Sequence, residues 1–168
     1  SGAAAASASV MPETMGARPG SVMDMFARQN AQAAQGEEAP ALEVPAGFDA
    51  AGFESVAKEN FVRLQKAWDT GDYNSLGDFT TDDLFIELTH SLRQRGAAKQ
   101  TSEVINLEAK LLGVAKMADA NEHIAVVQFK GAMKIEGEFE EVNERWVLTR
   151  KDDDSSGWLL AGIEQVSA

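Results

Sequence analysis

The sequence predicts an α+β fold in which N-terminal helices pack on one face of a curved, four-stranded antiparallel meander. Two observations lead to this fold class. Between Phe48 and Gly96, apolar residues recur at spacings of three and four, which is typical of helices with one buried face. After Gly96, apolar and polar residues alternate along segments joined by short turns, as in successive strands of an antiparallel sheet.

Residues 1–47 differ from the rest of the chain because they are rich in Ala, Ser, Gly, Gln and Pro. This composition predicts a flexible linker, followed by a folded domain over 48–168. Within the linker a short helix can form over 22–35, between an N-cap at Ser21 and a stop at Gly36. One face of that helix would carry Val22, Met25 and Phe26.

The first helix of the folded domain is predicted in "FDAAGFESVAKENFVRLQKAWDTGD", and Gly71 is expected to end it. Asp72 then caps a short helical turn, and Thr80 caps a third helix. The core-facing residues of the first and third helices are Phe53, Val56, Ala57, Phe61, Leu64, Trp68, Leu84, Phe85, Leu88 and Leu92.

The carboxylates of this helical corner each have a structural explanation. Asp69 and Asp72 flank the end of the first helix, and Asp82 and Asp83 lie in the first turn of the third helix, where the helix dipole favours anions. The corner is therefore interpreted as scaffold, and the alternative of an acidic catalytic centre is less favoured.

Four strands are predicted over 101–117, 123–135, 139–150 and 157–166. A tight turn at Glu136-Gly137 pairs Met133 with Glu140, Phe129 with Glu144 and Val127 with Trp146. The inner face, beneath the helices, is expected to hold Ile105, Leu107, Ala109, Leu111, Gly113, Ala115, Met117, Ala125, Val127, Phe129, Gly131, Met133, Ile135, Trp146, Leu148, Leu159, Ala161 and Ile163.

This register places Glu144 on the inner face, opposite Phe129, among apolar residues. A carboxylate in such a setting must be paired, hydrogen-bonded or protonated. One interpretation is a structural partner, such as Arg150, Arg63 or water at the open end of the sheet. The other is a catalytic acid or base in a pocket.

The outer face of the sheet is expected to be mixed. It would carry cations, opposing glutamates and apolar residues, namely Lys110, Lys116, Lys130, Lys134, Arg145, Glu108, Glu141, Glu164, Leu112, Val114, Val126, Val147, Trp158 and Leu160. A half-solvated antiparallel sheet accounts for this mixture. The alternative is a docking surface for a partner, a second copy of the chain or an anionic lipid headgroup.

Composition excludes several classes of function. The formal net charge of −12 disfavours nonspecific binding of the whole molecule to nucleic acid. The chain has no cysteine and only two histidines, so thiol catalysis, disulfides and thiolate or multi-histidine metal sites are not expected. There is no phosphate-binding glycine loop, and no cofactor is expected. The sequence contains no run of about 20 apolar residues that would span a membrane.

Three motifs in order resemble one known family. They are F-x7-F-x6-W-x3-D-x3-L from Phe53 to Leu76, E-x-W-x-L-x-R from Glu144 to Arg150, and W-x-L-x-G-I from Trp158 to Ile163. On these residues, about two-thirds of the chain resembles the C-terminal domain of Tim44, the tether of the mitochondrial inner-membrane import motor, and its bacterial relatives. That domain falls within the nuclear transport factor 2 superfamily.

The resemblance implies a cone-shaped domain with an apolar pocket between helices and sheet. It also implies a noncatalytic, membrane-associated adaptor whose partners are a membrane protein or translocation component and a phospholipid. The chain lacks the long basic N-terminal region of the mitochondrial protein, which favours a bacterial relative. Association with the bacterial inner membrane is then expected through a segment that precedes Ser1.

Two sets of site residues follow from these expectations. The pocket candidates are Phe61, Leu64, Trp68, Leu88, Val127, Phe129, Glu144, Trp146 and Leu148. The outer-face candidates, for a partner, a lipid or a homodimer, are Lys110, Lys130, Lys134, Arg145 and Trp158. The alternative function is a small-molecule isomerase or hydrolase that uses Glu144 as its acid or base, because members of the wider superfamily place carboxylates in the same pocket.

Overall fold

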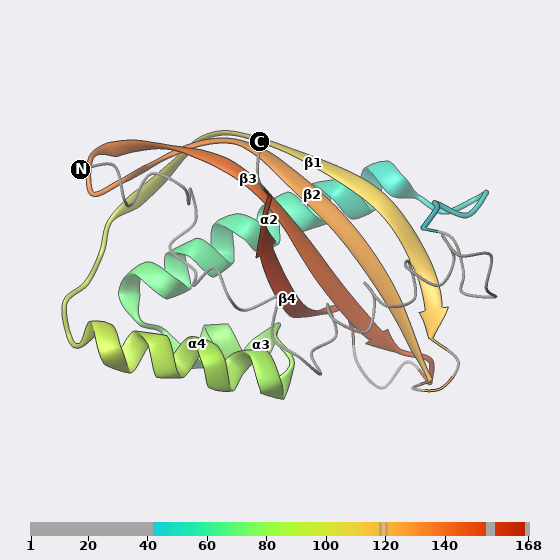
Figure 1. Cartoon of the computed structure of the whole chain (residues 1–168), viewed down its shortest axis with the longest axis horizontal. Coiled ribbons are helices and arrows are strands. Elements are labelled where there is room, and N and C mark those ends of the chain that lie inside the picture. Colours follow the sequence, from blue (N-terminus) through green and yellow to red (C-terminus); the bar gives the residue numbers. More distant parts are fainter. Residues whose placement is uncertain (1–41, 118, 120, 154–156, 167–168) are drawn as a thin grey trace.

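The computed structural model describes residues 42–153 and 157–166, except for residues 118 and 120. The predicted α+β fold is confirmed: three helices precede a four-stranded antiparallel sheet in the order β1-β2-β3-β4 (Figure 1). The elements are α2 (Ala50–Thr70), α3 (Tyr73–Asp78), α4 (Asp82–Arg95), β1 (Ser102–Met117), β2 (Glu122–Ile135), β3 (Glu138–Lys151) and β4 (Leu159–Gln165). The helix predicted over 22–35 lies outside the described residues.

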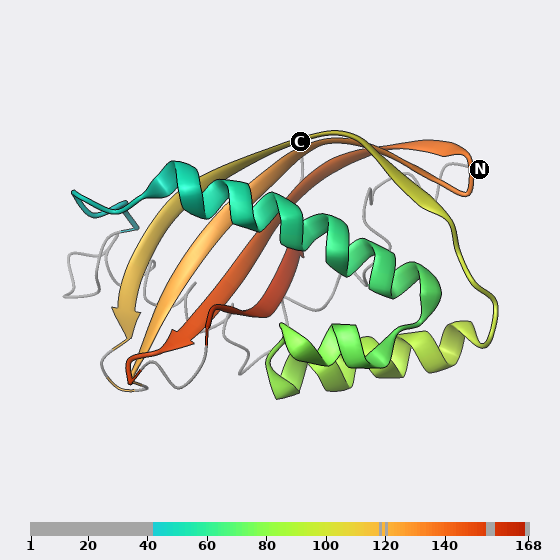
Figure 2. The ribbon, with the colours of Figure 1, turned by 180° about the vertical axis from the view of Figure 1, so that it is seen from behind.

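The long helix α2 crosses the concave side of the curved sheet (Figure 2). It begins at Asp49, whose side chain accepts a hydrogen bond from the Gly52 amide, and ends at Gly71 in the left-handed conformation with φ of 70°. The predicted stripe is buried at Ala57, Phe61, Leu64 and Trp68.

Val56 was expected in the same stripe, but its side chain is 54% exposed. The reason is angular. Each residue of an α-helix advances by about 100°, so Val56 lies about a quarter turn away from the line through Ala57, Phe61 and Leu64. It therefore falls on the flank of α2, where it remains accessible.

The carboxylate of Asp69 joins the end of α2 to the start of β1. Asp69 is 7% exposed, and its two oxygens accept hydrogen bonds from the Gln100 side chain and from both the amide and the hydroxyl of Ser102. The guanidinium of Arg95, at the end of α4, donates to the Trp68 carbonyl over 2.9 Å. The structural role predicted for this corner is confirmed at Asp69.

The cap predicted at Thr80 is wrong by one residue. Thr81 is the N-cap of α4, and its hydroxyl accepts a hydrogen bond from the Leu84 amide. Thr80 is instead buried, and its hydroxyl donates to the Leu76 carbonyl over 2.7 Å. The Thr81 amide donates to the Leu160 carbonyl over 2.9 Å, so the α3–α4 corner is attached to the beginning of β4.

The register predicted between β2 and β3 is confirmed. Met133 lies opposite Glu140, Phe129 opposite Glu144, and Val127 opposite Trp146. The two-residue turn between the strands has φ of 51° at Glu136 and 80° at Gly137, the left-handed pair that matches the twist of a tight hairpin.

Part of the predicted inner face is wrong because β1 contains two bulges. The register shifts between Val104 and Asn106, and again between Leu111 and Gly113. An extra residue at a bulge reverses the side to which the following residues point. Val104 and Val114 therefore contact the main core, whereas Ile105 is 42% exposed, and Ala115 and Met117 belong to the face opposite the helices.

A third shift, between Val147 and Leu148, changes the face assignment of β4. Leu148 lies opposite Leu160, and Leu160 is 1% exposed in the main core. The sequence had assigned Leu160 to the outer face and Leu159 to the inner face. The prediction for Ile163 is confirmed, because this residue lies opposite Trp146 and is buried with it.

Replacing Asp69 with Ala is expected to lower the free energy of unfolding by about 3 kcal/mol, because Ser102 and Gln100 lose a charged acceptor at a nearly closed site. Denaturant titration followed by circular dichroism measures this change. Asp72→Ala is the matched control, since it removes a carboxylate that caps only the exposed start of α3. An equal loss for both variants would contradict the role assigned to Asp69.

Candidate functional site

The centre of the inner face is filled by side chains. All nine pocket candidates, from Phe61 to Leu148, are between 0% and 4% exposed. The ring of Phe61 lies 5.0 Å from that of Phe129 and 5.4 Å from that of Trp146, and the rings of Phe129 and Trp146 are 4.8 Å apart. These are contact distances for packed aromatic rings, so most of the predicted pocket residues form the core itself.

Glu144 lies within this packed region and is 1% exposed. Its Oε1 accepts a hydrogen bond from the Trp146 indole N–H over 2.8 Å, and its Oε2 accepts one from the Gln165 amide over 3.3 Å. The carboxylate therefore has one hydrogen-bonded neighbour on its own strand, β3, and one on the adjacent strand, β4, as the structural interpretation requires. The partner predicted for that interpretation was an arginine or water, and the structure adds Trp146 and Gln165.

An open apolar groove lies beside the N-terminal half of α2. We call it the α2–β4 groove. It encloses about 480 Å³. Its lining consists of Phe48, Asp49, Gly52, Phe53, Val56, Ala57, Asn60, Leu148 and Trp158. Leu148 is the one pocket candidate among these residues, so the structure moves the accessible hollow away from the predicted pocket.

Aromatic side chains form the walls of the α2–β4 groove. The Phe53 ring lies 5.8 Å from Phe48 and meets the Trp158 ring edge-on at 5.4 Å and 89°. Trp158 was expected on the outer face of the sheet, and this placement is wrong. It precedes β4 at the edge of the sheet, and there its ring turns toward α2 and packs against the main core.

Sequence periodicity missed this groove because its residues come from three separate places. Phe48 lies before α2, Val56 lies off the buried stripe, and Trp158 follows a turn. The signal that could have found it is Val56, a large apolar residue about a quarter turn from the stripe of α2.

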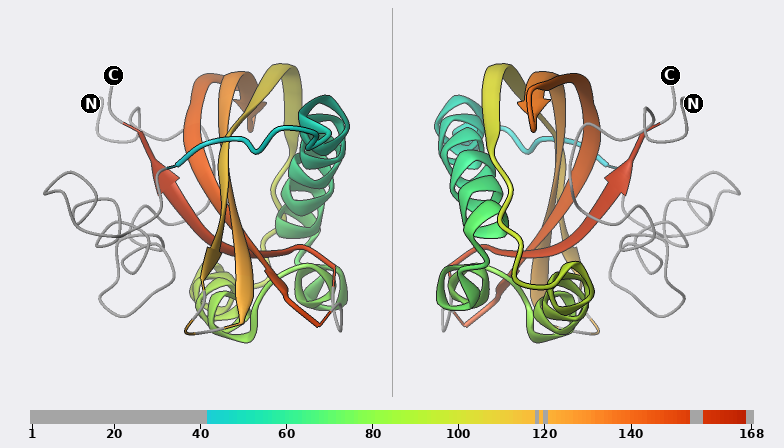
Figure 3. Two further views of the ribbon diagram at one scale, coloured as in Figure 1. Left: turned by 90° about the vertical axis from the view of Figure 1, so that its right-hand side faces the viewer. Right: turned by 90° about the vertical axis from the view of Figure 1, so that its left-hand side faces the viewer.

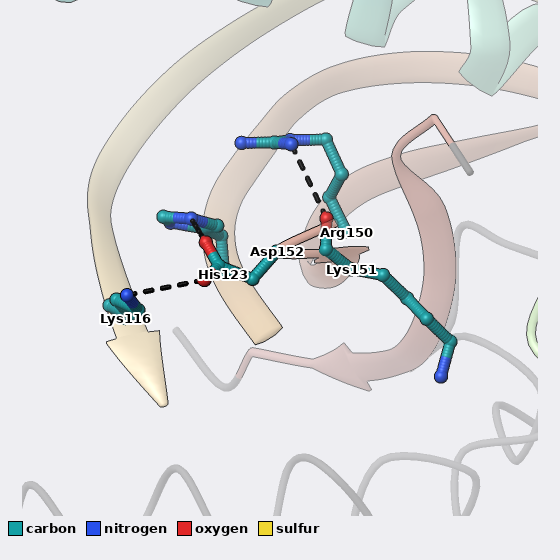
Figure 4. A network of polar contacts seen from close by, with 5 residues as sticks. All are labelled: Lys116, His123, Arg150, Lys151 and Asp152. Atoms are coloured by element: carbon teal, nitrogen blue, oxygen red, sulfur yellow. Dashed lines mark hydrogen bonds and ion pairs between the residues drawn. The ribbon is translucent and has the colours of Figure 1, made fainter. Parts of the chain in front are cut away.

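A network of polar contacts joins Lys116, His123 and Asp152 at one end of the sheet, with Arg150 and Lys151 beside it (Figure 4). The Asp152 carboxylate contacts the His123 ring at 2.8 Å and the Lys116 ammonium at 3.3 Å. The hydrogen bond to His123, and then the bond to Lys116, lower the pKa of Asp152 below its ordinary value of 3.8. Arg150 extends from this network toward the groove, with its guanidinium 5.4 Å from the centre of the Trp158 ring.

The other outer-face candidates lie on the face that the sequence predicted. Lys110, Gln128, Arg145 and Glu164 form one cross-strand row, and Arg145 makes an ion pair of 3.4 Å with Glu164. Lys130 lies opposite Asn143, and Lys134 opposite Phe139, which is 64% exposed. The structure therefore brings these cations together on one half of the outer face.

Two smaller hollows lie near the C-terminal end of α2. They enclose about 250 and 350 Å³, and charged or polar side chains such as Arg63, Lys66, Arg93 and Lys99 make up much of their lining. Glu144 is not among the residues that line either of them or the α2–β4 groove. Within the described part of the chain, no group of three or more acidic or histidine side chains is arranged to hold a metal ion.

The model of the Tim44-like domain family matches residues 34–165, so the chain belongs to this family. Tim44-like domains are membrane-associated, protein-binding and generally noncatalytic. No curated protein matches the chain. None of the helices in the described ranges is long and apolar enough to cross a membrane.

Glu144→Ala is expected to lower the free energy of unfolding by about 3 kcal/mol, because the buried Trp146 N–H loses its acceptor. Glu144→Gln keeps an acceptor oxygen for Trp146 and is expected to cost less. Denaturant titrations with circular dichroism compare the two variants. If Glu144→Ala is as stable as the parent protein, the carboxylate is not a structural part of the core.

Asp152 makes stability depend on pH in a defined direction. Because its pKa is lowered in the folded state, the ionised form stabilises the fold, and this contribution is present above pH 3.8 and lost as the pH falls through the folded pKa. The stability difference between the parent protein and Asp152→Asn should therefore be present at about pH 5 and shrink below pH 3.8. Thermal unfolding of both proteins across this range measures it, and a difference that does not change with pH would refute the assignment.

Proposed function

We propose that this domain is a noncatalytic, membrane-associated adaptor that holds an apolar segment of a partner protein in the α2–β4 groove. The observation that carries the proposal is the groove itself, an open hollow of about 480 Å³ with aromatic walls on a domain of a protein-binding family. Its volume falls within the range of about 300–1,000 Å³ that is usual for ligand sites.

The lining of the groove suits an apolar segment. Phe53, Val56 and Trp158 offer apolar area, and tryptophan is among the residue types that provide most of the binding energy at interfaces. The Asp49 carboxylate and the Asn60 amide add polar groups to the lining, and the Arg150 guanidinium lies 5.4 Å from the centre of the Trp158 ring. A partner helix with apolar residues at spacings of three and four would present a matching ridge.

The location of the adaptor is proposed from the family and from the sequence together. Association with the bacterial inner membrane, through a segment that precedes Ser1, would hold the groove near a membrane protein or a translocation component. A phospholipid acyl chain is the alternative occupant of the same groove, because it offers the same apolar chemistry. The catalytic alternative gains no support, since Glu144 is closed off within the core.

Photo-crosslinking in native membranes tests the groove. A benzophenone amino acid replaces Val56, which lines the groove and is 54% exposed, or Val62, which is 48% exposed on the same helix but is not part of the groove. An adduct is expected at Val56 and not at Val62. Val56→Asp, combined with a photo-probe at Asn60 in the same lining, should reduce adduct yield about tenfold or more, because it places a charge in an apolar contact.

The mass of the adduct identifies the occupant. A protein adduct supports the adaptor proposal, and a lipid adduct shows that the groove holds an acyl chain. Native mass spectrometry of the protein purified from its own host provides a second reading, since a bound lipid would add its mass until the protein is denatured. Equal yields at Val56 and Val62 would reject the groove as a specific site.

A further inference from the structure

A second apolar cluster lies on the outer face of the sheet. This outer cluster consists of Met117, Ile124, Val126 and Val147, with Leu42 and Leu112 packed against it. Its four strand residues are between 0% and 3% exposed, which is the burial of the main core. Yet α2, α3 and α4 are on the inner side of the sheet or at its end (Figure 3). None of these helices covers the outer cluster.

The described chain enters this face from its N-terminal side. The segment 42–49 passes from the start of α2 to the opposite side of the sheet (Figure 3). There the Glu43 carbonyl accepts a hydrogen bond from the Val114 amide over 2.9 Å, and Leu42 packs against the outer cluster. The residues immediately before Leu42 are therefore delivered to the edge of this cluster.

Gly113 allows Leu42 and Glu43 to approach the backbone of β1 closely. A Cβ atom at this position would collide with the side chain of Leu42 and with the backbone nitrogen of Glu43. The absence of a side chain thus forms a notch in β1, and Leu42 fills it. Such a close approach of two backbones indicates that the chain before α2 belongs against this face of the sheet.

We propose that residues 21–36 of this same chain dock on the outer cluster. This segment has the pattern of an amphipathic helix, with Val22, Met25 and Phe26 on one face and Ala31 on the other. An isolated helix of this length is marginal in water and gains its stability from packing of its apolar face. The outer cluster is an apolar face that no described helix covers, although its strand residues are buried.

The connection is long enough for this docking. The six peptide steps from Gly36 to Leu42 can extend over about 20 Å. The outer cluster runs from β1 to β3, a distance of about 10 Å at the usual strand spacing.

The consequence is that residues 21–36 cover the apolar half of the outer face of their own chain. This proposal does not rest on the function of the α2–β4 groove, which lies at the other side of the sheet. It implies that the apolar half of the outer face is unavailable to a second copy, while the groove stays accessible.

Paramagnetic labelling of the full chain tests the docking. Because the protein contains no cysteine, a spin label attaches only at the cysteine that is introduced. A spin label is attached at Ala31→Cys, on the side of the segment away from its apolar residues, or at Ser7→Cys as the matched control. Methyl signals of Ile124, Val126 and Val147 report on the outer cluster. The signal of Val127, from the inner face of β2, serves as the internal reference.

The label at position 31 is expected to cause a severalfold greater loss of intensity at the outer methyls than at Val127, and the label at position 7 is not. Adding Phe26→Asp should abolish this difference, because it removes the apolar contact. The proposal is overturned if inner and outer methyls lose intensity equally, if the effect persists with Phe26→Asp, or if it arises between molecules in a mixture of labelled and isotope-enriched chains. The last outcome would show that a second copy covers the face.

Discussion

The contact on which the rest of the structure depends is the packing of Phe61 on α2 against Phe129 and Trp146 of the sheet. Three rings within 5.4 Å of one another fill the centre of the concave side. Trp146 is also held by Glu144, which fixes its indole N–H, and Glu144 is bonded to Gln165 of β4. A carboxylate in this position orients a core tryptophan. Because the centre is filled, the accessible apolar hollow among the described residues lies away from it, in the α2–β4 groove.

The ends of the helices are attached to the sheet by few but specific polar contacts. Asp69 connects α2 to β1, and the backbone of Thr81 connects the α3–α4 corner to β4. Each contact satisfies backbone groups that would otherwise be left without partners at an element boundary. They hold the C-terminal end of α2 in place, and the α2–β4 groove lies beside its N-terminal half. The adaptor site that we propose lies at that end.

Much of the fold was predictable, whereas the site was not. Helix stripes, the Gly71 stop and the hairpin at Glu136-Gly137 depend on neighbouring residues, so local patterns reveal them. The register that puts Glu144 on the inner face was predictable for the same reason. The faces of Ile105, Ala115 and Leu160 were not, because a single inserted residue at a bulge reverses them and nothing in the alternation marks it. Trp158 was misplaced because its ring turns at a strand end, where the alternation of faces does not apply.

The sequence by itself determined the fold class, the order of the elements, most of the core and the family to which the chain belongs. These properties arise from periodicity and capping, which act over a few residues along the chain. The tertiary structure decided which apolar residues close the core and which remain accessible. That difference depends on bulges, on the volume of the three rings of Phe61, Phe129 and Trp146, and on where Leu42 meets Gly113. These are contacts between residues far apart in the sequence.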